Sequence, residues 1–247
     1  HEDLHFDFIK DYKDLNNYLI ENMATGESHA IFIDEIQDIE AFEKALRSLL
    51  LRENTDIYVT GSNSKMLSSD ISTYLSGRYV EIPIYSLSYQ EFLEFNNLQD
   101  DDKSLALFMK YGGLPYLKNL KLDDEIVYEY LKSIYSTILY RDIVKRYNIR
   151  NTEFLERLVL FIADNIGSLF SAKNISDFLK SQNIRQQSNQ ILTDMDYLSQ
   201  AFIIHKVRKY DIVGKRIFEI GEKFYFNDLG IRNSIIGYKP QDRGKLV

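Results

Sequence analysis

Two acidic side chains follow a short apolar run in the first part of the chain. The run Ala30–Ile33 leads directly into Asp34 and Glu35, and apolar runs of this kind favour a buried parallel strand. The carboxyl ends of parallel strands open on the ligand crevice of α/β sheets. Hydrolysis of a nucleotide needs a carboxylate for Mg²⁺ and a group that orients the attacking water. The pattern therefore makes Asp34 a candidate Mg²⁺ ligand and Glu35 a candidate catalytic group, and a strand that ends at a polar turn is the alternative.

A second polar cluster follows the next predicted strand. The run Asp56–Thr60 is rich in β-branched and aromatic residues, which favours a strand, and Gly61, Ser62 and Asn63 come next. If the two strands are neighbours, Ser62 or Asn63 lies beside the acidic pair and contacts the γ-phosphate or the water. Ser and Asn are also good helix caps. Both side chains are therefore candidate nucleotide-sensing residues, candidate caps of a following helix, or both.

An arginine precedes a third predicted strand. Arg78 follows Gly77 and leads into Tyr79–Ile84, where Pro83 favours a strand end or edge. An arginine at such a junction can reach the nucleotide of a neighbouring subunit, where it is worth about 10³–10⁵ in rate; a surface arginine is the alternative. With predicted helices between the strands, at 39–51 and 64–75, the pattern predicts a parallel α/β sheet with crossover helices.

The rest of the chain divides into two further parts. Helical periodicity and short β-like runs follow residue 86; the helices are predicted at 88–95, 102–111, 123–147, 152–166, 171–182 and 187–200, and the β-like runs at 202–209, 216–220 and 223–226. Three helices followed by a β-ribbon describe a winged helix-turn-helix. We therefore predict the end of an α/β core at 1–86, a helical lid at 87–150 and a winged-helix domain at 151–247.

The last helix of the predicted winged-helix domain, 187–200, would be its recognition helix. Amide and arginine side chains read base edges, and basic side chains on a wing contact phosphates. The candidate nucleic-acid residues are Arg185, Gln187, Asn189, Lys206, Arg208 and Lys209.

Acidic residues and a modest charge weigh against nucleic-acid binding. Asp194 and Asp196 lie on the predicted recognition helix. The chain carries a net charge of −7, and residues 151–247 hold 14 Lys and Arg against 11 Asp and Glu. A net charge of +3 is small for a DNA-binding domain. DNA and a partner protein both stay open as ligands of this part.

The composition excludes several classes of site. The sequence has no cysteine, so disulfides, zinc–thiolate sites and cysteine nucleophiles are excluded for these residues. This is typical of a reducing compartment, and we expect a cytoplasmic location. No apolar run approaches the roughly 20 residues of a membrane span, so no membrane partner is expected.

Four sequence motifs occur in a characteristic order: IFIDEIQDI, VTGSNSKML, LSGRYVEIPIYSLSYQEF and YGGLPYL. In this order the chain resembles archaeal and bacterial AAA-type ATPases that carry a C-terminal nuclease-like domain. The stretch Ile138–Arg146 and the closing residues 242–246 are similar to the same family, so the resemblance covers nearly the whole chain. It implies a P-loop core that uses ATP and Mg²⁺, with Asp34 and Glu35 as the Walker B pair, followed by a lid, a winged helix and a nuclease-like domain.

The phosphate-binding loop of that family, G-x-x-x-x-G-K-[ST], does not occur in the sequence. Gly26 lacks a suitably spaced lysine, and Gly214–Lys215 lacks the earlier glycine and the following Ser or Thr. The resemblance implies that the loop lies before His1 and the nuclease-like domain after Val247. It also implies that the strand before the loop lies between the second and third predicted strands in the sheet.

The missing loop changes what we expect of this chain by itself. The loop's amides and lysine supply most of the grip on the phosphates. We therefore expect these 247 residues to bind ATP poorly, to lack activity alone, and to associate with further copies through unpaired strand edges. The competing function is a winged-helix DNA- or protein-binding module on an inactive ATPase-like scaffold.

Overall fold

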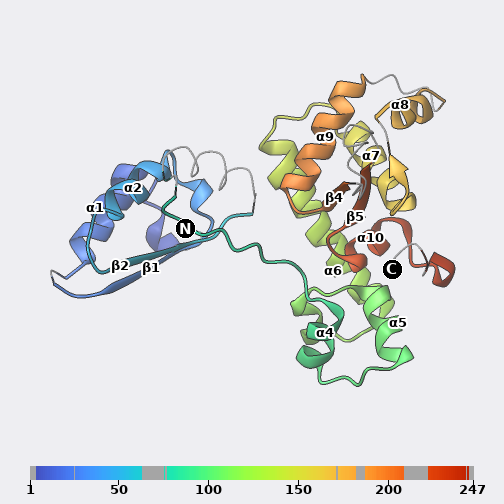
Figure 1. The fold of residues 1–247 in the computed structure, drawn as a ribbon, viewed down its shortest axis with the longest axis horizontal. Helices are drawn as coiled ribbons and strands as arrows, with labels where there is room; N and C mark the ends of the chain where they lie inside the picture. Colours follow the sequence, from blue (N-terminus) through green and yellow to red (C-terminus); the bar gives the residue numbers. More distant parts are fainter. Residues whose placement is uncertain are drawn as a thin grey trace, which may run out of the picture. The chain divides into compact units, whose positions relative to one another are not determined.

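The chain forms two compact units, residues 1–82 and 83–247. The computed structural model describes residues 4–24, 26–62, 75, 77–170, 172–181, 187–208, 222–242 and 244 (Figure 1). Each unit has its own hydrophobic core. The division of residues 83–247 at residue 150, into a lid and a winged-helix domain, stays a prediction. Within the described ranges no helix is both long enough and apolar enough to cross a membrane.

The first unit is a two-stranded parallel sheet with short helices. Its elements are η1 (Leu4–Phe6), α1 (Tyr12–Asn22), β1 (His29–Ile33), η2 (Ile36–Asp38), α2 (Phe42–Leu49) and β2 (Thr55–Val59). The strands β1 and β2 pair in parallel, with Ile31 opposite Ile57. The predicted strands and the helix between them are therefore present, although α2 is shorter than the predicted 39–51. The predicted helix 64–75 lies outside the described residues except for Leu75.

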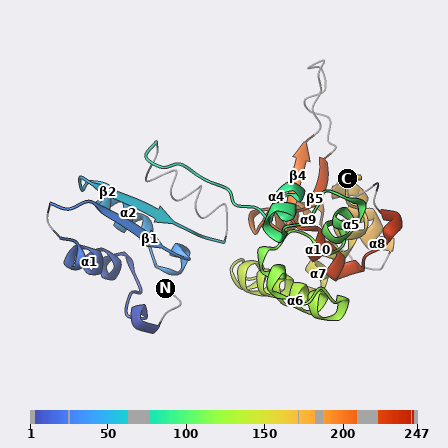
Figure 2. The same ribbon diagram turned by 90° about the horizontal axis from the view of Figure 1, so that it is seen from below.

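Helices α1 and α2 lie on one side of the β1–β2 sheet (Figures 1 and 2). Alternation along the strands directs Ile33 and Ile57 toward the core that the helices cover. On the other side Phe32 and Tyr58 are 75% and 54% exposed, and their rings stack with centroids 4.9 Å apart. The sheet of the first unit is thus covered on one face and exposed on the other over its described residues.

Residues 79–84 form no strand, so the predicted third strand is wrong. Val80, Ile82 and Ile84 are 85%, 76% and 84% exposed. A strand needs a neighbour for its backbone N–H and C=O groups, and no strand in the described part of the chain pairs with this segment. The β-branched composition indicated a strand, but pairing depends on a partner that the local sequence does not reveal.

The second unit combines helices with a small antiparallel sheet. Its elements are α4 (Tyr89–Asn96), α5 (Asp102–Tyr111), η4 (Pro115–Asn119), α6 (Asp124–Thr137), the π-helix η5 (Ile138–Lys145), α7 (Thr152–Asp164), β3 (Leu169–Phe170), α8 (Ala172–Ser181), α9 (Ser188–Gln200), β4 (Ile204–Arg208), β5 (Glu222–Phe226), α10 (Leu229–Ile236) and η6 (Pro240–Asp242). The sheet has the order β3–β5–β4. The predicted helix 102–111 is present with its predicted ends, and the other predicted helices are present with shifted ends. The predicted helix 123–147 becomes π-helical from Ile138 onward. The predicted run 216–220 lies outside the described residues.

Helix α10 packs against α5, α6, α7 and β5 (Figure 1). Its N-cap is Asp228, whose carboxylate accepts hydrogen bonds from the backbone N–H groups of Ile231 at 2.9 Å and Gly113 at 2.8 Å. Burial raises the pKa of the Asp228 carboxyl, and hydrogen bonds from Gly113 and Ile231 oppose that rise. One buried side chain therefore joins the start of α10 to the turn after α5.

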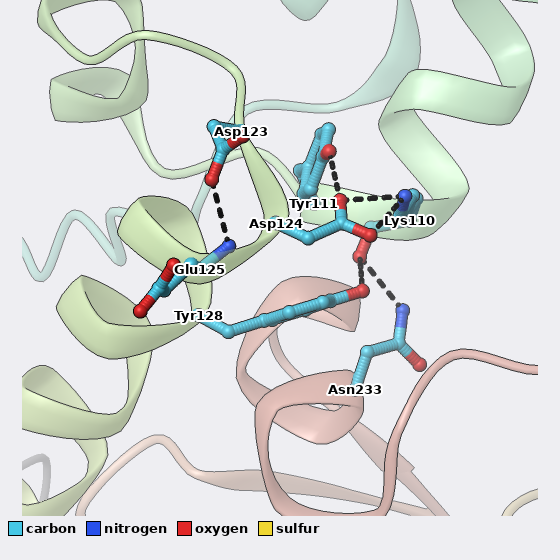
Figure 3. Close-up of polar contacts among 7 residues, drawn as sticks. All are labelled: Lys110, Tyr111, Asp123, Asp124, Glu125, Tyr128 and Asn233. Atoms are coloured by element: carbon cyan, nitrogen blue, oxygen red, sulfur yellow. Dashed lines mark hydrogen bonds and ion pairs between the residues drawn. The ribbon is translucent and has the colours of Figure 1, made fainter.

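A polar network joins α5, α6 and α10 (Figure 3). Helix α5 ends at Tyr111, so its last carbonyls have no partner within the helix. The carbonyl of Lys110 accepts from Asn233 Nδ2 at 2.9 Å and from the Tyr128 hydroxyl at 3.4 Å. Lys110 Nζ lies 2.6 Å from Asp124 Oδ1, and the Tyr111 hydroxyl donates to the same carboxylate. The end of α5 is thus capped by side chains from two other helices.

Candidate functional site

Polar side chains gather where β1 and β2 end. Because the strands are parallel and Ile33 lies opposite Val59, the residues that follow each strand come to the same edge of the sheet. The backbone N–H of Thr60 donates to the Ile33 carbonyl at 3.0 Å, and that of Ile36 donates to the Thr60 carbonyl at 3.1 Å. These bonds extend the pairing by one step and fix the turn that carries Asp34.

The hydroxyl of Thr60 contacts both residues of the acidic pair. It donates to the Asp34 carboxylate and accepts from the backbone N–H of Glu35 at 3.2 Å. Thr60 was not predicted as a site residue. In the segment that follows β2, the prediction named only Ser62 and Asn63. The strand register contains the missing signal, because a polar residue one step past β2 must lie opposite Asp34, one step past β1.

The side chain of Gln37 links Glu35 to Ser62. Gln37 Nε2 donates to the Glu35 carboxylate and lies 3.4 Å from Ser62 Oγ. Glu35 itself has a left-handed backbone, with φ 49° and ψ 50°. The structure therefore brings together Asp34, Glu35 and Ser62 of the predicted set. Gln37, like Thr60, was not predicted as a site residue.

The other two predicted residues of this site have different outcomes. Asn63 lies outside the described residues. The Arg78 side chain is exposed, and its backbone N–H donates to the Leu75 carbonyl at 2.9 Å. No contact in the described part of the chain brings this side chain to Asp34 or Glu35, and its role stays a prediction.

The oxygen atoms at the strand ends suit Mg²⁺. Asp34 is exposed and carries a carboxylate beside the Thr60 hydroxyl. Protein sites for Mg²⁺ commonly use one or two carboxylates and complete the shell with water and substrate phosphates. Within the described ranges no group of three or more His, Cys, Asp and Glu side chains could hold a metal. The Asp34 carboxylate could thus serve as one ligand of an ion whose other ligands are water and phosphate oxygens.

The predicted nucleic-acid residues are only partly described. Gln187 is the N-cap of α9, and Gln187 and Asn189 are both exposed. Lys206 Nζ pairs with Glu222 Oε2 at 2.8 Å, between β4 and β5. Arg208 is placed by its backbone in β4, whereas Arg185 and Lys209 lie outside the described residues.

The Asp194 side chain is buried inside the second unit. It is 1% exposed, and its Oδ1 accepts from Gln190 Nε2 at 2.8 Å. Burial raises the pKa of the Asp194 carboxyl, and the hydrogen bond from Gln190 opposes that rise. Of the two acids that weighed against nucleic-acid binding, only Asp196 is therefore exposed on α9.

Comparison with known families and relatives divides the chain in two. Residues 2–93 match an AAA domain, and residues 102–242 match a Domain of unknown function (DUF8612). An uncharacterized protein of Haemophilus influenzae is 36% identical over 243 residues, covering 96% of this chain and 60% of that protein. An uncharacterized protein of Methanocaldococcus jannaschii is 31% identical over 245 residues, covering 95% and 54%. The chain thus spans little more than half the length of these relatives.

A Walker-type ATPase of Pyrococcus abyssi is similar in structure. The TM-score is 0.54 with 17% sequence identity, and the likeness covers 91% of this chain and 67% of that chain. The mixed α/β fold with its small parallel sheet is therefore similar to a P-loop ATPase fold. Together with the match to an AAA domain, this likeness supports a relationship to P-loop, AAA-like proteins.

Proposed function

We propose that this chain, which belongs to the family of the Domain of unknown function (DUF8612), is part of an AAA-type ATPase and hydrolyses ATP in the complete protein. The observation that carries the proposal is the meeting of Asp34, Glu35 and Ser62 at the ends of two parallel strands. Phosphoryl transfer to water depends on positioning and charge stabilisation rather than covalent chemistry, and these side chains supply such groups at one edge of the sheet.

Each side chain has a separate task in the proposed reaction. Asp34 holds Mg²⁺, and the Thr60 hydroxyl fixes the direction of the Asp34 carboxylate. Glu35 orients and polarises the attacking water, while Ser62 or Asn63 contacts the γ-phosphate. Mg²⁺, when bound, neutralises charge on the phosphates.

The remaining parts of the reaction come from outside the described site. The sequence contains no phosphate-binding loop, so we place the main grip on the phosphates in the further length of the complete protein. Arg78 is proposed to act on the nucleotide of a neighbouring copy, which makes a homo-oligomer part of the proposal. ATP and Mg²⁺ are the ligands that this function requires.

Loss of the Asp34 carboxylate and loss of the Glu35 carboxylate should impair ATP hydrolysis in different ways. In the full-length protein, Asp34→Asn should weaken Mg²⁺-dependent binding of a fluorescent ATP analogue, because the carboxylate that holds the ion is lost. Glu35→Gln should keep that binding and slow phosphate release by about 10²–10³-fold, as loss of a general base does.

A matched substitution three residues beyond Glu35 serves as the control. Asp38→Asn changes an exposed carboxylate at the end of η2 and should leave binding and phosphate release unchanged. An active Glu35→Gln protein would contradict the proposed function. Tight ATP binding by the 247 residues alone would contradict the placement of the phosphate grip outside them.

We propose a nucleic-acid interface on residues 151–247 as the second candidate function. The order α7–β3–α8–α9–β4–β5, with β5 between β3 and β4, supports a winged-helix domain. The buried position of Asp194 favours this function, because it removes one negative charge from the surface of α9. Gln187 and Asn189 would then meet base edges, and Lys206, Arg208 and Lys209 would meet phosphates.

Charge reversal on β4 tests the second candidate. Arg208→Glu should abolish the gel shift of a duplex DNA at low salt, because electrostatic contacts to phosphates carry most of such binding. The matched control is Lys103→Glu on α5, which reverses an exposed charge elsewhere in the same unit and should leave the shift intact. Equal loss in both variants would mean non-specific attraction, and no shift by the unsubstituted protein would favour a partner protein.

A further inference from the structure

The turn after β1 holds the backbone of Glu35 in a conformation that residues with a side chain rarely adopt. Its φ of 49° and ψ of 50° lie in the left-handed region, and such a backbone persists only where surrounding contacts fix it. Here the backbone N–H of Glu35 donates to the Thr60 hydroxyl at 3.2 Å, and that of Ile36 donates to the Thr60 carbonyl at 3.1 Å. The Ile36 side chain is fully buried in the core of the first unit. The end of β2 thus sets the turn that follows β1.

This turn folds the Gln37 amide back over Glu35. Gln37 Nε2 donates to Glu35 Oε2, and Ser62 Oγ lies 3.4 Å from the same nitrogen. A glutamine amide has two N–H hydrogens, so one nitrogen can serve both oxygen atoms. All three side chains are half-buried. The Gln37 amide therefore connects the carboxylate after β1 with the hydroxyl after β2.

We propose that Gln37 is a positioning residue that orients the Glu35 carboxylate and makes its orientation depend on Ser62. The role rests on the proposed ATPase function and assigns a means of regulation to the same site. Ser62 is one of the two residues proposed to contact the γ-phosphate, so a change of its position on nucleotide binding reaches Glu35 through the Gln37 side chain. Gln37 does not touch the nucleotide or the attacking water.

The expected effect on rate follows from the geometry. A hydrogen bond to a carboxylate is charge-assisted and stronger than one between neutral groups, so loss of the amide removes one contact that orients the Glu35 carboxylate. Misplacement of a reacting group by about 1 Å can slow a reaction by about 10²-fold. Ground-state binding of the nucleotide does not use Glu35, so affinity should not follow the rate.

The test compares steady-state ATP hydrolysis in full-length variants. Gln37→Met keeps the length and volume of the side chain and removes the amide. It should lower kcat about 10- to 100-fold, leave the KM for Mg·ATP within about twofold, and leave thermal unfolding unchanged. The matched control is Gln90→Met, because the exposed Gln90 amide donates to the Glu94 carboxylate at 3.3 Å on α4. This control should behave as the unsubstituted protein.

A double-substitution cycle separates positioning from a general structural role. Ser62 is also proposed to contact the γ-phosphate, so Ser62→Ala should lower kcat by itself. If Gln37 acts through Ser62, that reduction should be smaller in the Gln37→Met background than in the unsubstituted protein. If the two substitutions lower kcat by factors that simply multiply, the coupling between Gln37 and Ser62 is overturned. If Gln37→Met fails to fold, Gln37→Asn gives the same comparison, because it keeps the amide but shortens its reach by one methylene.

The outcomes distinguish this role from the function on which it rests. If Glu35→Gln abolishes hydrolysis while Gln37→Met keeps the unsubstituted kcat, only the role of Gln37 is overturned. If the unsubstituted full-length protein releases no phosphate, or Glu35→Gln is fully active, the proposed function is overturned and the role of Gln37 with it. A parallel rise in KM and loss of thermal stability would assign Gln37 to the fold instead.

Discussion

Replacement of Gly230 by alanine is expected to destabilise residues 83–247 by about 3 kcal/mol or more. A Cβ at this position would lie 1.9 Å from the Tyr111 carbonyl oxygen and 2.5 Å from the carbonyl carbon. Both atoms belong to the backbone at the end of α5, so no side-chain rotation can relieve the overlap. Separation of α10 from α5 would also disturb the Asp228 carboxylate, which caps α10 and binds Gly113.

The direction of the change in stability distinguishes the effect of packing from that of helix propensity. A glycine-to-alanine change inside a helix normally stabilises by about 1 kcal/mol, so helix propensity and packing predict opposite shifts of the unfolding midpoint. Urea unfolding followed by circular dichroism measures the shift. Gly244→Ala is the control, because a Cβ there meets nothing within 4 Å. A raised midpoint for Gly230→Ala would contradict the close contact between α5 and α10.

Removal of the Asp242 carboxylate is expected to destabilise the same unit by about 3–5 kcal/mol. The Arg232 side chain is 0% exposed, and its Nη2 lies 3.1 Å from Asp242 Oδ2. Its Nε donates to the Ala163 carbonyl and its Nη1 to Asn233 Oδ1, each at 3.0 Å. In Asp242→Ala the guanidinium keeps these neutral acceptors but loses its carboxylate, and it cannot lose its proton.

Two comparisons isolate the buried charge as the cause. Arg232→Met combined with Asp242→Leu should lose much less stability than Asp242→Ala, because no uncompensated charge remains in the core. Asp177→Ala removes an exposed pair with Lys180, whose atoms are 3.4 Å apart, and should change the unfolding free energy by less than about 1 kcal/mol. Equal losses in Asp242→Ala and Asp177→Ala would show that burial of Arg232 is not decisive.

The candidate catalytic edge was predictable where residues close together in the sequence determine it. Asp34 and Ser62 follow apolar or β-branched runs, and parallel strands must deliver such residues to one edge. Thr60 and Gln37 were not predicted, because their roles depend on hydrogen bonds across the strand ends and on a left-handed turn. Asn63 and Arg78 keep their proposed roles as predictions.

Helix positions were predicted more accurately than strand pairing. The starts of several helices depend on a capping side chain within three residues, as at Ser88, Asp101 and Asn151. The segment 79–84 has strand-like composition but forms no strand, because pairing requires a neighbour that is distant in sequence. Helices α1 and α10 and the two-residue strand β3 were not predicted.

The sequence by itself determined the two parallel strands, the acidic pair after the first, the helical series and the late β-ribbon, because caps and apolar periodicity act over a few residues. The tertiary structure alone decided which polar groups are buried. Asp194 and Arg232 look like surface residues in the sequence, yet both lie inside the second unit. Desolvation of a charged or polar group is tolerated only where partners meet it. For Arg232 those partners are Ala163, which is 69 residues away in the sequence, and Asp242, which lies 10 residues further along the chain.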